Sequence, residues 1–457
     1  MDRSARMRAQ NIGGLLWSFS LPAIIGMLVN SLYNVVDRIF VGRGVGSLGI
    51  AATTVSFPIM ILLMGVSILI GVGATALISI RLGEQDNEGA EKVAGNAMTM
   101  LVLLPATLAV IVLFSIEPVL TAFGASSEVL PYARDYLQII MLGAVFGSIG
   151  MGMNNFIRAE SNPHMAMYTQ ILGAIVNIIL NYFYIFVFKW GMKGAAFATI
   201  TGQFVAAVWV LGYFFTGRSL VKLRLKNLKP SWPVLASIMA IGFAPFGMQI
   251  ASSAQQLILN RTLTFYGGDM ALSAVGIMMS LGTLFFMPIL GLSQGAQPIV
   301  GFNYGARQYD RVKETWKKAV FAASCIALAG YLVIHIWPTQ LVELFSDGDT
   351  ELTAMTVDAM MTFFAMLPVI GFQIISSTYF QAVGKAAQSA VLSLSRQVLM
   401  FIPLLLILPR FWGIEGVWRT APIADFLAVS LTAVFICIEM KHLGEQNANK
   451  KRSEGHA

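Results

Sequence analysis

One acidic residue lies inside a long apolar run near the start of the chain. Asp37 belongs to the run NSLYNVVDRIFVG, in which Asn30, Tyr33, Asn34 and Asp37 recur at the three- and four-residue spacing of a helix. This spacing places a polar stripe on one helix face. A carboxyl group in a water-poor cleft can exchange a proton near neutral pH, so Asp37 is the first candidate for binding a proton or another cation.

An interfacial ion pair is the alternative interpretation of this aspartate, because Arg38 follows it directly. Successive helix residues point about 100° apart, which makes Arg38 a poor direct partner. An ionisable side chain inside the hydrocarbon costs about 2.5–3.5 kcal/mol on insertion scales, and such a residue is a functional candidate by default. We therefore favour a functional role for Asp37.

Amides and hydroxyls recur at helical spacing further along the first half. Asn177 and Asn181 lie one turn apart in GAIVNIILNYFYIF, and Thr199 lies in the next apolar run. A single uncharged polar group in a membrane helix often does no more than bond a neighbouring helix. Together with Asp37, these residues could line a polar chamber in the N-terminal half.

Two opposite charges lie near the middle of the last two apolar runs. Arg396 and Asp425 belong to runs that we expect to form antiparallel neighbouring helices, so the sequence predicts that the two side chains pair. Such a buried pair either shapes a cavity and steadies one conformation, or it is a static structural contact.

Motifs for metal binding, nucleotide binding and covalent catalysis are missing from the sequence. The four histidines are far apart, and there is neither an H-E-x-x-H motif nor a P-loop. Cys325 and Cys437 lie in apolar runs and predict no disulfide. We expect no metal, no cofactor and no enzymatic activity, and transport would draw its energy from an ion gradient.

The elements that carry these residues are predicted to be membrane-spanning helices. Of 457 residues, 56% are hydrophobic and only 12% are charged, whereas about 25% charged residues are usual in a soluble domain. Apolar runs of about 20 residues, enough to cross a hydrocarbon core, recur along the chain. The twelve predicted spans are 14–40, 48–80, 92–116, 130–158, 164–188, 193–216, 234–265, 270–303, 312–336, 352–382, 385–409 and 414–439.

The net charge of +7 comes from lysines and arginines that gather in alternate loops. This is the positive-inside pattern, which places both termini in the cytoplasm and requires no nucleic acid as a partner. The predicted location is the plasma membrane of a bacterium or an archaeon, and the lipid bilayer is the predicted surroundings of the chain.

A basic segment, residues 217–233, divides the predicted spans six and six. Short phrases recur on either side of it at an offset of 222 or 223 residues, so that Pro22 corresponds to Pro245 and Gly73 to Gly295. We infer an internal duplication. The predicted domains are an N-lobe at 1–216, a cytoplasmic linker at 217–233, a C-lobe at 234–440 and a cytoplasmic tail at 441–457.

The duplication also relates the polar faces of the two halves. Gln256 and Asn260 stand where the first half has Tyr33 and Asp37, so the second half keeps the polar face and loses the acid. Each half has an even number of spans, and both therefore start on the same side of the membrane. Parallel repeats of this kind typically enclose a site at their interface and expose it alternately to the two sides. The sequence thus predicts an all-α membrane protein that works as a secondary active transporter.

Four runs resemble those of the multidrug and toxic compound extrusion (MATE) transporters. They are LPAIIGMLVNSLYNVVDRIFVG in the first span, RAESNP after the fourth, NIILNYFYIF in the fifth and MKGAAFAT at the start of the sixth. The resemblance covers nearly the whole chain. It implies a V-shaped pair of six-helix lobes that exports mostly cationic, amphipathic compounds in exchange for protons or sodium ions.

The resemblance also implies roles for single residues of the N-lobe. Asp37 matches the carboxylate that exchanges protons or cations, and Tyr33, Asn177 and Thr199 match positions of the same chamber. Asn181 stands where family members often have an aspartate, which leaves Asp37 as the only acid of the chamber. We assign Asn34 and Asn181 to the chamber as well.

The C-lobe departs from the pattern of sodium-coupled members, which carry acids on spans 7 and 10. Gln256 and Gln373 are the nearest polar residues to those positions. This departure favours proton coupling over sodium coupling, and the branch related to DNA-damage-inducible protein F fits best. The residues assigned to a C-lobe cavity are Gln256, Asn260, Gln373, Arg396 and Asp425.

Small-molecule drugs or toxic organic cations are the expected partners, and a monomer is the expected state. A lipid-linked oligosaccharide flippase of the same superfamily is the first alternative. Such flippases usually carry extra spans and a strongly cationic cavity, whereas Arg396 is the main arginine in the middle of a span here. A membrane-embedded enzyme would need clustered catalytic residues, and a passive channel would not need the duplication.

Overall fold

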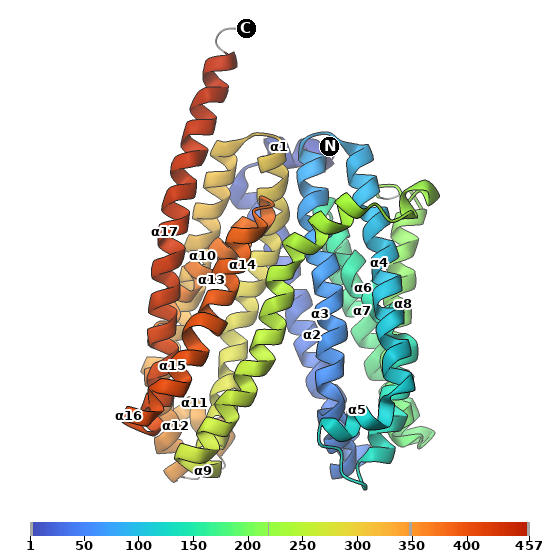
Figure 1. Ribbon diagram of the computed structural model, residues 1–457, viewed down its shortest axis with the longest axis vertical. Coiled ribbons are helices and arrows are strands. Elements are labelled where there is room, and N and C mark those ends of the chain that lie inside the picture. The colour runs from blue at the N-terminus through green and yellow to red at the C-terminus, as the bar shows by residue number, and fades with distance from the viewer. Residues whose placement is uncertain (1–2, 218, 347–349, 455–457) are drawn as a thin grey trace.

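The computed structural model describes residues 3–217, 219–346 and 350–454, and the regular elements within these ranges are all helices (Figure 1). The first half of the chain forms α1 (Arg3–Ala9), α2 (Ile12–Gly44), α3 (Ser47–Gly83), α4 (Asn87–Phe114), α5 (Ile116–Ala122), α6 (Leu130–Ala159), α7 (Pro163–Asn181), the π-helix η1 (Tyr182–Val187) and α8 (Gly191–Phe215).

The second half begins with the 3-10 helix η2 (Leu225–Leu228). It continues with α9 (Trp232–Gly305), α10 (Tyr309–Ile336), α11 (Pro338–Ser346), α12 (Thr350–Phe363), α13 (Leu367–Ala382), α14 (Ala386–Leu394), the π-helix η3 (Ser395–Phe401), α15 (Ile402–Ile407), α16 (Pro409–Trp412) and α17 (Ile414–Glu454). Gly268, at φ 64°, divides the long α9 into two spans. We call α2–α8 the N-lobe and α9–α17 the C-lobe.

Length and composition agree with a multi-pass membrane protein. Over the described ranges, 11 helices are long and apolar enough to cross a membrane, or 12 if the bent pair α12 and α13 forms one span. The sequence predicted one span at 352–382, and the structure shows that this segment is bent, because α12 and α13 meet at an angle of 51°. Pro368, in the first turn of α13, lacks the N–H group that a continuous helix needs, and it accounts for a break at this place.

The two lobes form a V, as the resemblance implies. Figure 1 shows the helices close together at the end of the molecule that holds both termini, and diverging toward the other end. We call these the terminal end and the open end. At the terminal end, glycines let the backbones touch: a Cβ atom at Gly73 on α3 would overlap the carbonyl oxygen of Ile238 on α9, and one at Gly242 would overlap that of Leu69. Side chains larger than hydrogen at these positions would push the lobes apart.

The internal duplication is also visible in the short helices and the π-helices of the two lobes. The short helices α5 and α11 begin 222 residues apart, at Ile116 and Pro338, and each follows a long span. Both lie at the open end in Figure 1. The fifth span of each lobe contains a π-helix, η1 in the N-lobe and η3 in the C-lobe. The internal duplication thus extends beyond the phrases that the sequence repeats.

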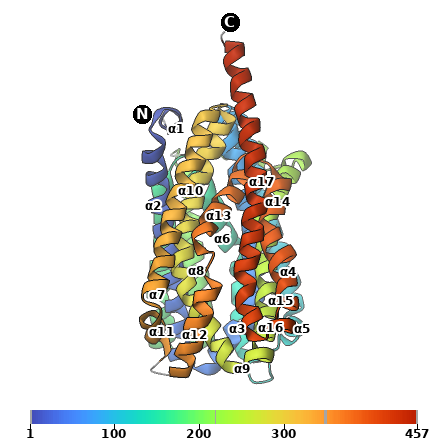
Figure 2. The same cartoon turned by 90° about the vertical axis from the view of Figure 1, so that its left-hand side faces the viewer.

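The last helix, α17, passes the predicted end of the C-lobe without a break. It runs from Ile414 to Glu454 and extends beyond the other helices at the terminal end (Figure 2). The sequence placed a separate tail at 441–457, and the described part of that segment is a continuation of the helix. Residues 455–457 of the predicted tail, and Arg218 of the predicted linker, lie outside the described residues.

Candidate functional site

Asp37 is bonded to an amide that lies 144 residues further along the chain. Asn181 Nδ2 on α7 donates to Asp37 Oδ1 at 2.7 Å and to Asn177 Oδ1 at 3.0 Å. Asn177 Nδ2 in turn donates to Thr199 Oγ1 on α8 at 3.4 Å. One row of polar contacts therefore joins α2, α7 and α8, and it contains four residues that the sequence assigned to one chamber.

The row is buried except at the carboxylate. Asn177, Asn181 and Thr199 are 3%, 0% and 6% exposed, and Asp37 is half-buried. Asn181 Oδ1 is also buried, and no donor within the described ranges reaches it. An unpaired buried acceptor costs about 1–3 kcal/mol. The carboxylate therefore stands next to an amide oxygen that a hydrogen-bond donor or a cation would stabilise.

Two tyrosines lie within electrostatic range of Asp37. Tyr33 is one turn away on α2, and Tyr136 comes from α6, where it is 3% exposed and its hydroxyl lies 3.8 Å from Met60 Sδ. The sequence assigned Tyr33 to this chamber and missed Tyr136. A single tyrosine in an apolar run produces no periodic polar pattern, so no sequence signal pointed to it.

Arg38 does not neutralise the aspartate. Its guanidinium carbon lies 5.8 Å from the ring centroid of Phe57 on α3, and no ion pair to Asp37 is present among the described residues. The sequence predicted this divergence from the angle between successive helix positions. Asp37 thus bonds to an amide, and Arg38 lies within electrostatic range of it without forming an ion pair.

A π-helix follows the amide that holds Asp37. In η1 the Phe188 amide donates to the carbonyl oxygen of Phe183, five residues earlier, at 2.8 Å. Such wide turns rotate the side chains on either side of them and occur frequently at functional sites. Asn181 stands directly before this change of helix type, with its side chain aimed at α2.

Asn34 lies apart from the polar row. It is exposed, and its Nδ2 donates to the carbonyl oxygen of Asn30 on its own helix at 2.7 Å. The structure therefore joins Asp37, Asn177, Asn181 and Thr199 directly and does not bring Asn34 to them.

The acid of the C-lobe has a cationic partner. Arg396 Nε on η3 lies 2.5 Å from Asp425 Oδ1 on α17, and the Asp425 side chain is 2% exposed. The predicted pairing of these charges is confirmed. Because the partner is a guanidinium that stays charged at all physiological pH values, this carboxylate is already neutralised.

The other residues assigned to the C-lobe cavity are scattered. Gln256 Nε2 donates to Asn260 Oδ1 on the same helix at 2.8 Å, and Gln256 is exposed. Gln373 is buried on α13. One polar contact between helices was missed: Gln397 Nε2 on η3 donates to Ser252 Oγ on α9 at 2.8 Å.

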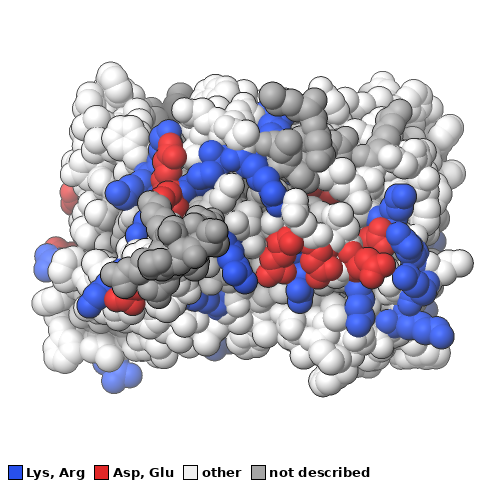
Figure 3. Space-filling model, turned by 90° about the horizontal axis from the view of Figure 1, so that it is seen from above, with Lys and Arg blue, Asp and Glu red and all other residues white. Residues whose placement is uncertain are grey.

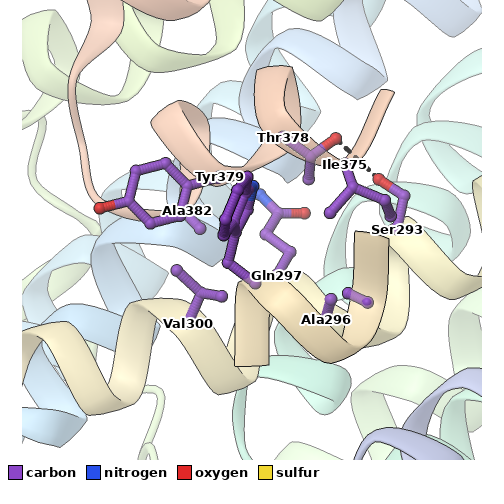
Figure 4. A pocket seen from close by; sticks show the side chains of 10 residues that line it. Ser293, Ala296, Gln297, Val300, Ile375, Thr378, Tyr379 and Ala382 are labelled. Carbon is purple, nitrogen blue, oxygen red and sulfur yellow. Dashed lines mark hydrogen bonds between the residues drawn. The ribbon is translucent and has the colours of Figure 1, made fainter. Parts of the chain in front are cut away.

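A small cavity lies within the C-lobe between α9, α10 and α13 (Figure 4). Its volume of about 10 Å³ suits a single water molecule and excludes an organic substrate. Gln297 lines it, and its Nε2 is buried without a partner among the residues that the structure covers. Ser293 and Thr378 bond to each other across its edge, at 2.7 Å. The cavity is therefore a water-sized gap between helices of the lobe, lined mainly by apolar side chains.

A family model described as MatE matches two segments of the chain, residues 22–183 and 245–407. Together the segments cover well over half of the sequence. They begin 223 residues apart, which agrees with the offset of the internal repeat.

Curated relatives are similar over nearly their whole length. The multidrug export protein MepA of Staphylococcus aureus is 28% identical over 418 residues, which are 92% of each chain. The protein of the same name from Staphylococcus haemolyticus is 27% identical over 424 residues, or 93% of each chain.

Solved structures share the fold. One titled as a crystal structure of MATE in the bent conformation superposes with a TM-score of 0.92 at 25% identity, covering 98% of this chain and 99% of that one. Another, titled as the outward-facing conformation of a multidrug resistance MATE family transporter of the MOP superfamily, has a TM-score of 0.90 at 25% identity, covering 97% and 99%.

Proposed function

The chain belongs to the MatE family of transporters, and we propose that it exports amphipathic, mostly cationic organic compounds by antiport against protons. The observation that carries this proposal is the setting of Asp37. It is a half-buried carboxylate inside a span, held by the buried amide of Asn181 and without a cationic partner among the described residues. The relatives named as multidrug export proteins support the substrate class.

A carboxylate of this kind can hold either a proton or an organic cation. When it is ionised, Asp37 accepts from Asn181 Nδ2 and attracts a positive charge. When it takes up a proton, its hydroxyl becomes a donor, and Asn181 Oδ1 offers an acceptor that is otherwise unpaired. The charge that attracted the substrate is then gone. Binding of a proton and binding of a cationic substrate thus exclude each other at one group, which is a condition for antiport.

The position of the closed end supports alternating access. With both termini in the cytoplasm, as the basic loops predict, the terminal end is the cytoplasmic end and the V opens outward. Pro22 lies inside α2 and cannot complete the helical hydrogen-bond ladder, so α2 can bend there. We propose that protonation of Asp37 from outside favours this bend and the closure of the N-lobe chamber.

Proton coupling is favoured over sodium coupling by the atoms around Asp37. Hard metal cations are bound by several oxygen ligands at once. The contact to Asp37 comes from an amide N–H, and Asn181 supplies no second carboxylate. We propose a monomer in a bacterial or archaeal plasma membrane, with small-molecule drugs or toxic organic cations as its substrates.

A flippase for lipid-linked oligosaccharides is the second candidate from the same superfamily. An anionic substrate of that kind would need free positive charge in the cavity. Arg396, the main arginine in the middle of a span, is neutralised by Asp425 at 2.5 Å. This pairing favours the export of cations.

Efflux from proteoliposomes tests the proposal. A fluorescent organic cation is loaded, and its release is followed under an imposed pH gradient and, separately, under a sodium gradient. We expect the pH gradient to drive release by the parent and not by Asp37→Asn. Release that is driven by the sodium gradient and does not respond to pH would identify sodium, and not the proton, as the coupling ion. Unchanged release by Asp37→Asn would refute the role of this carboxylate.

A further inference from the structure

The segment between the two lobes is folded onto the N-lobe. The described residues 219–231 lead into α9 and lie beside α4 and α8 at the terminal end, where Figure 1 draws them in green. We call this segment the interlobe linker. The polar backbone of an unbonded connection would form its hydrogen bonds with water. The interlobe linker is instead bonded to buried side chains at both ends.

Glu160, directly after α6, holds the first part of the linker. It is 0% exposed, and it accepts hydrogen bonds from Ser219 Oγ at 2.5 Å, from the Leu220 and Val221 amides at 3.0 and 3.1 Å, and from the Tyr213 hydroxyl at 3.0 Å. Charge-assisted bonds of this kind are about twice as strong as neutral ones. The start of the linker is therefore fixed to the end of α6.

Side chains of α4 hold the middle and end of the linker. Arg224 Nε lies 2.7 Å from Glu91 Oε2, a carboxylate that is 7% exposed. Asn96, which is 1% exposed, donates to the Asn227 carbonyl oxygen at 3.0 Å and accepts from the Ser231 amide at 2.6 Å. The linker thus follows α4 over more than one turn.

These contacts set the position of the linker along α4. Thr99 Oγ1, which donates to the Leu228 carbonyl oxygen at 2.7 Å, is the deepest of the α4 residues that bond it, and Glu91 is the shallowest. At 1.5 Å per residue from the start of α4 at Asn87, they lie roughly 6–18 Å along the helix. The linker therefore lies along the terminal part of a helix that is long and apolar enough to cross a membrane.

The outer surface of the linker combines exposed apolar and basic side chains. Leu225 is 86% exposed and Trp232, at the start of α9, is 74% exposed. Lys222, Lys226 and Lys229 are exposed as well, and among the described residues no carboxylate lies within ion-pair distance of them. Figure 3 shows lysines and arginines at the edge of the terminal end on the side of α4 and α8.

We propose that the interlobe linker is a binding site for anionic phospholipids. Lys222, Lys226 and Lys229 bind the phosphate groups, and Leu225 and Trp232 insert between the acyl chains beneath them. Tryptophan is enriched at membrane interfaces, and basic residues beside an anionic leaflet attract its headgroups. Because the linker is fixed to α4 and α6, bound lipid holds the N-lobe at a defined height while the C-lobe moves.

Lipid binding to the purified full-length chain tests this site independently of transport. Phosphatidylglycerol and phosphatidylcholine of equal chain length are titrated in detergent, and bound lipid is counted by native mass spectrometry. Each lysine near an anionic surface contributes about a fivefold change in binding. We expect Lys222→Gln/Lys226→Gln/Lys229→Gln to bind phosphatidylglycerol at least roughly tenfold more weakly and phosphatidylcholine unchanged.

The matched control removes three lysines from the C-lobe at the same end, as Lys313→Gln/Lys317→Gln/Lys441→Gln. It should keep its phosphatidylglycerol binding. Equal losses in the two triple variants, or undiminished binding by the linker variant, would overturn the proposal. Inorganic phosphate in place of lipid should not compete at equal concentration, and if it does, the site recognises free phosphate. Melting temperatures in lipid-free detergent show that both variants are folded.

Discussion

The two lobes descend from one duplicated unit, yet they treat their membrane-embedded acids in opposite ways. Asp37 of the N-lobe is bonded to the amide of Asn181, whereas Asp425 of the C-lobe is bonded to the guanidinium of Arg396. An amide carries no net charge and does not compensate that of the carboxylate, whereas a guanidinium does. Under the proposed mechanism, the partner of an acid, more than its burial, determines whether the acid can exchange a proton.

A second comparison concerns the terminal ends of the lobes. Each lobe has a hydrogen bond from a tyrosine to a glutamate, but the helices that carry the two residues are exchanged. In the N-lobe, Glu160 follows α6 and accepts from Tyr213 on α8 at 3.0 Å. In the C-lobe, Tyr379 on α13 donates to Glu439 on α17, also at 3.0 Å. By the internal repeat, α6 corresponds to α13 and α8 to α17. A bond that only holds two helices together can change direction during divergence, because either helix can supply either partner.

The largest expected effect separates the two aspartates by function. Asp37→Asn should reduce proton-driven efflux to the rate of protein-free vesicles, because the amide can neither take up a proton nor attract a cation. Its melting temperature should stay close to that of the parent. Asn34→Ala is the control, since Asn34 is exposed and bonds only its own helix within the described contacts. Loss of efflux in this control would mean that the whole polar face of α2 is needed.

The next effect separates the aspartates by stability. Asp425→Ala leaves Arg396 without its buried partner and should destabilise the fold by about 3 kcal/mol, which thermal unfolding would detect. Efflux per folded molecule should fall much less than in Asp37→Asn. Exchanging both charges, as Arg396→Asp/Asp425→Arg, should recover part of the lost stability. No recovery would show that the geometry of the pair, and not only its charge, is required.

A smaller effect is expected when a second carboxylate is placed next to Asp37, as in a site that binds a metal cation. Asn181→Asp adds a second carboxylate beside the first and should shift the dependence of efflux from the pH gradient toward the sodium gradient, because two carboxylates bind a metal cation better than one. Asn181→Ala, which removes the bond at 2.7 Å, should weaken efflux without this shift. The ratio of the two gradient-driven rates measures the change. An unaltered ratio in Asn181→Asp would contradict the proposed basis of ion choice.

The smallest expected effect is a pH dependence of the folding stability that comes from Glu160 at the terminal end. Burial raises the pKa of Glu160 above its ordinary value, while hydrogen bonds from Ser219, Leu220, Val221 and Tyr213 oppose the shift. A carboxyl group whose pKa is higher in the folded state favours folding when protonated. Its contribution is therefore present below the ordinary glutamate pKa of about 4.3 and is lost as the pH rises through the raised value.

Melting temperatures between pH 4 and pH 8 test this contribution, since Glu160→Gln should flatten the decline with rising pH. Tyr213→Phe is the uncharged comparison. It removes one donor, should cost about 1 kcal/mol, and should keep the pH dependence. A steeper decline in Glu160→Gln would reverse the assigned direction.

Local patterns were enough to predict most elements and part of the site. Apolar runs predicted the membrane-spanning helices, and the spacing around Asp37 predicted a polar face on α2. The break between α12 and α13 was missed, because hydropathy alone does not register a bend within an apolar segment. Tyr136 was missed for a related reason, since its electrostatic proximity to Asp37 depends on how the helices of the N-lobe pack together.

The sequence by itself determined the membrane class and the duplicated architecture, and it predicted which acid could exchange a proton, because each of these depends on the order of neighbouring residues. Only the tertiary structure decided that Asn181 reaches Asp37 across 144 residues, that the lobes meet at the terminal end, and that the interlobe linker lies along α4. Those features depend on the angles and distances between helices. Such angles result from the packing of many side chains at once, and no single run of residues specifies them.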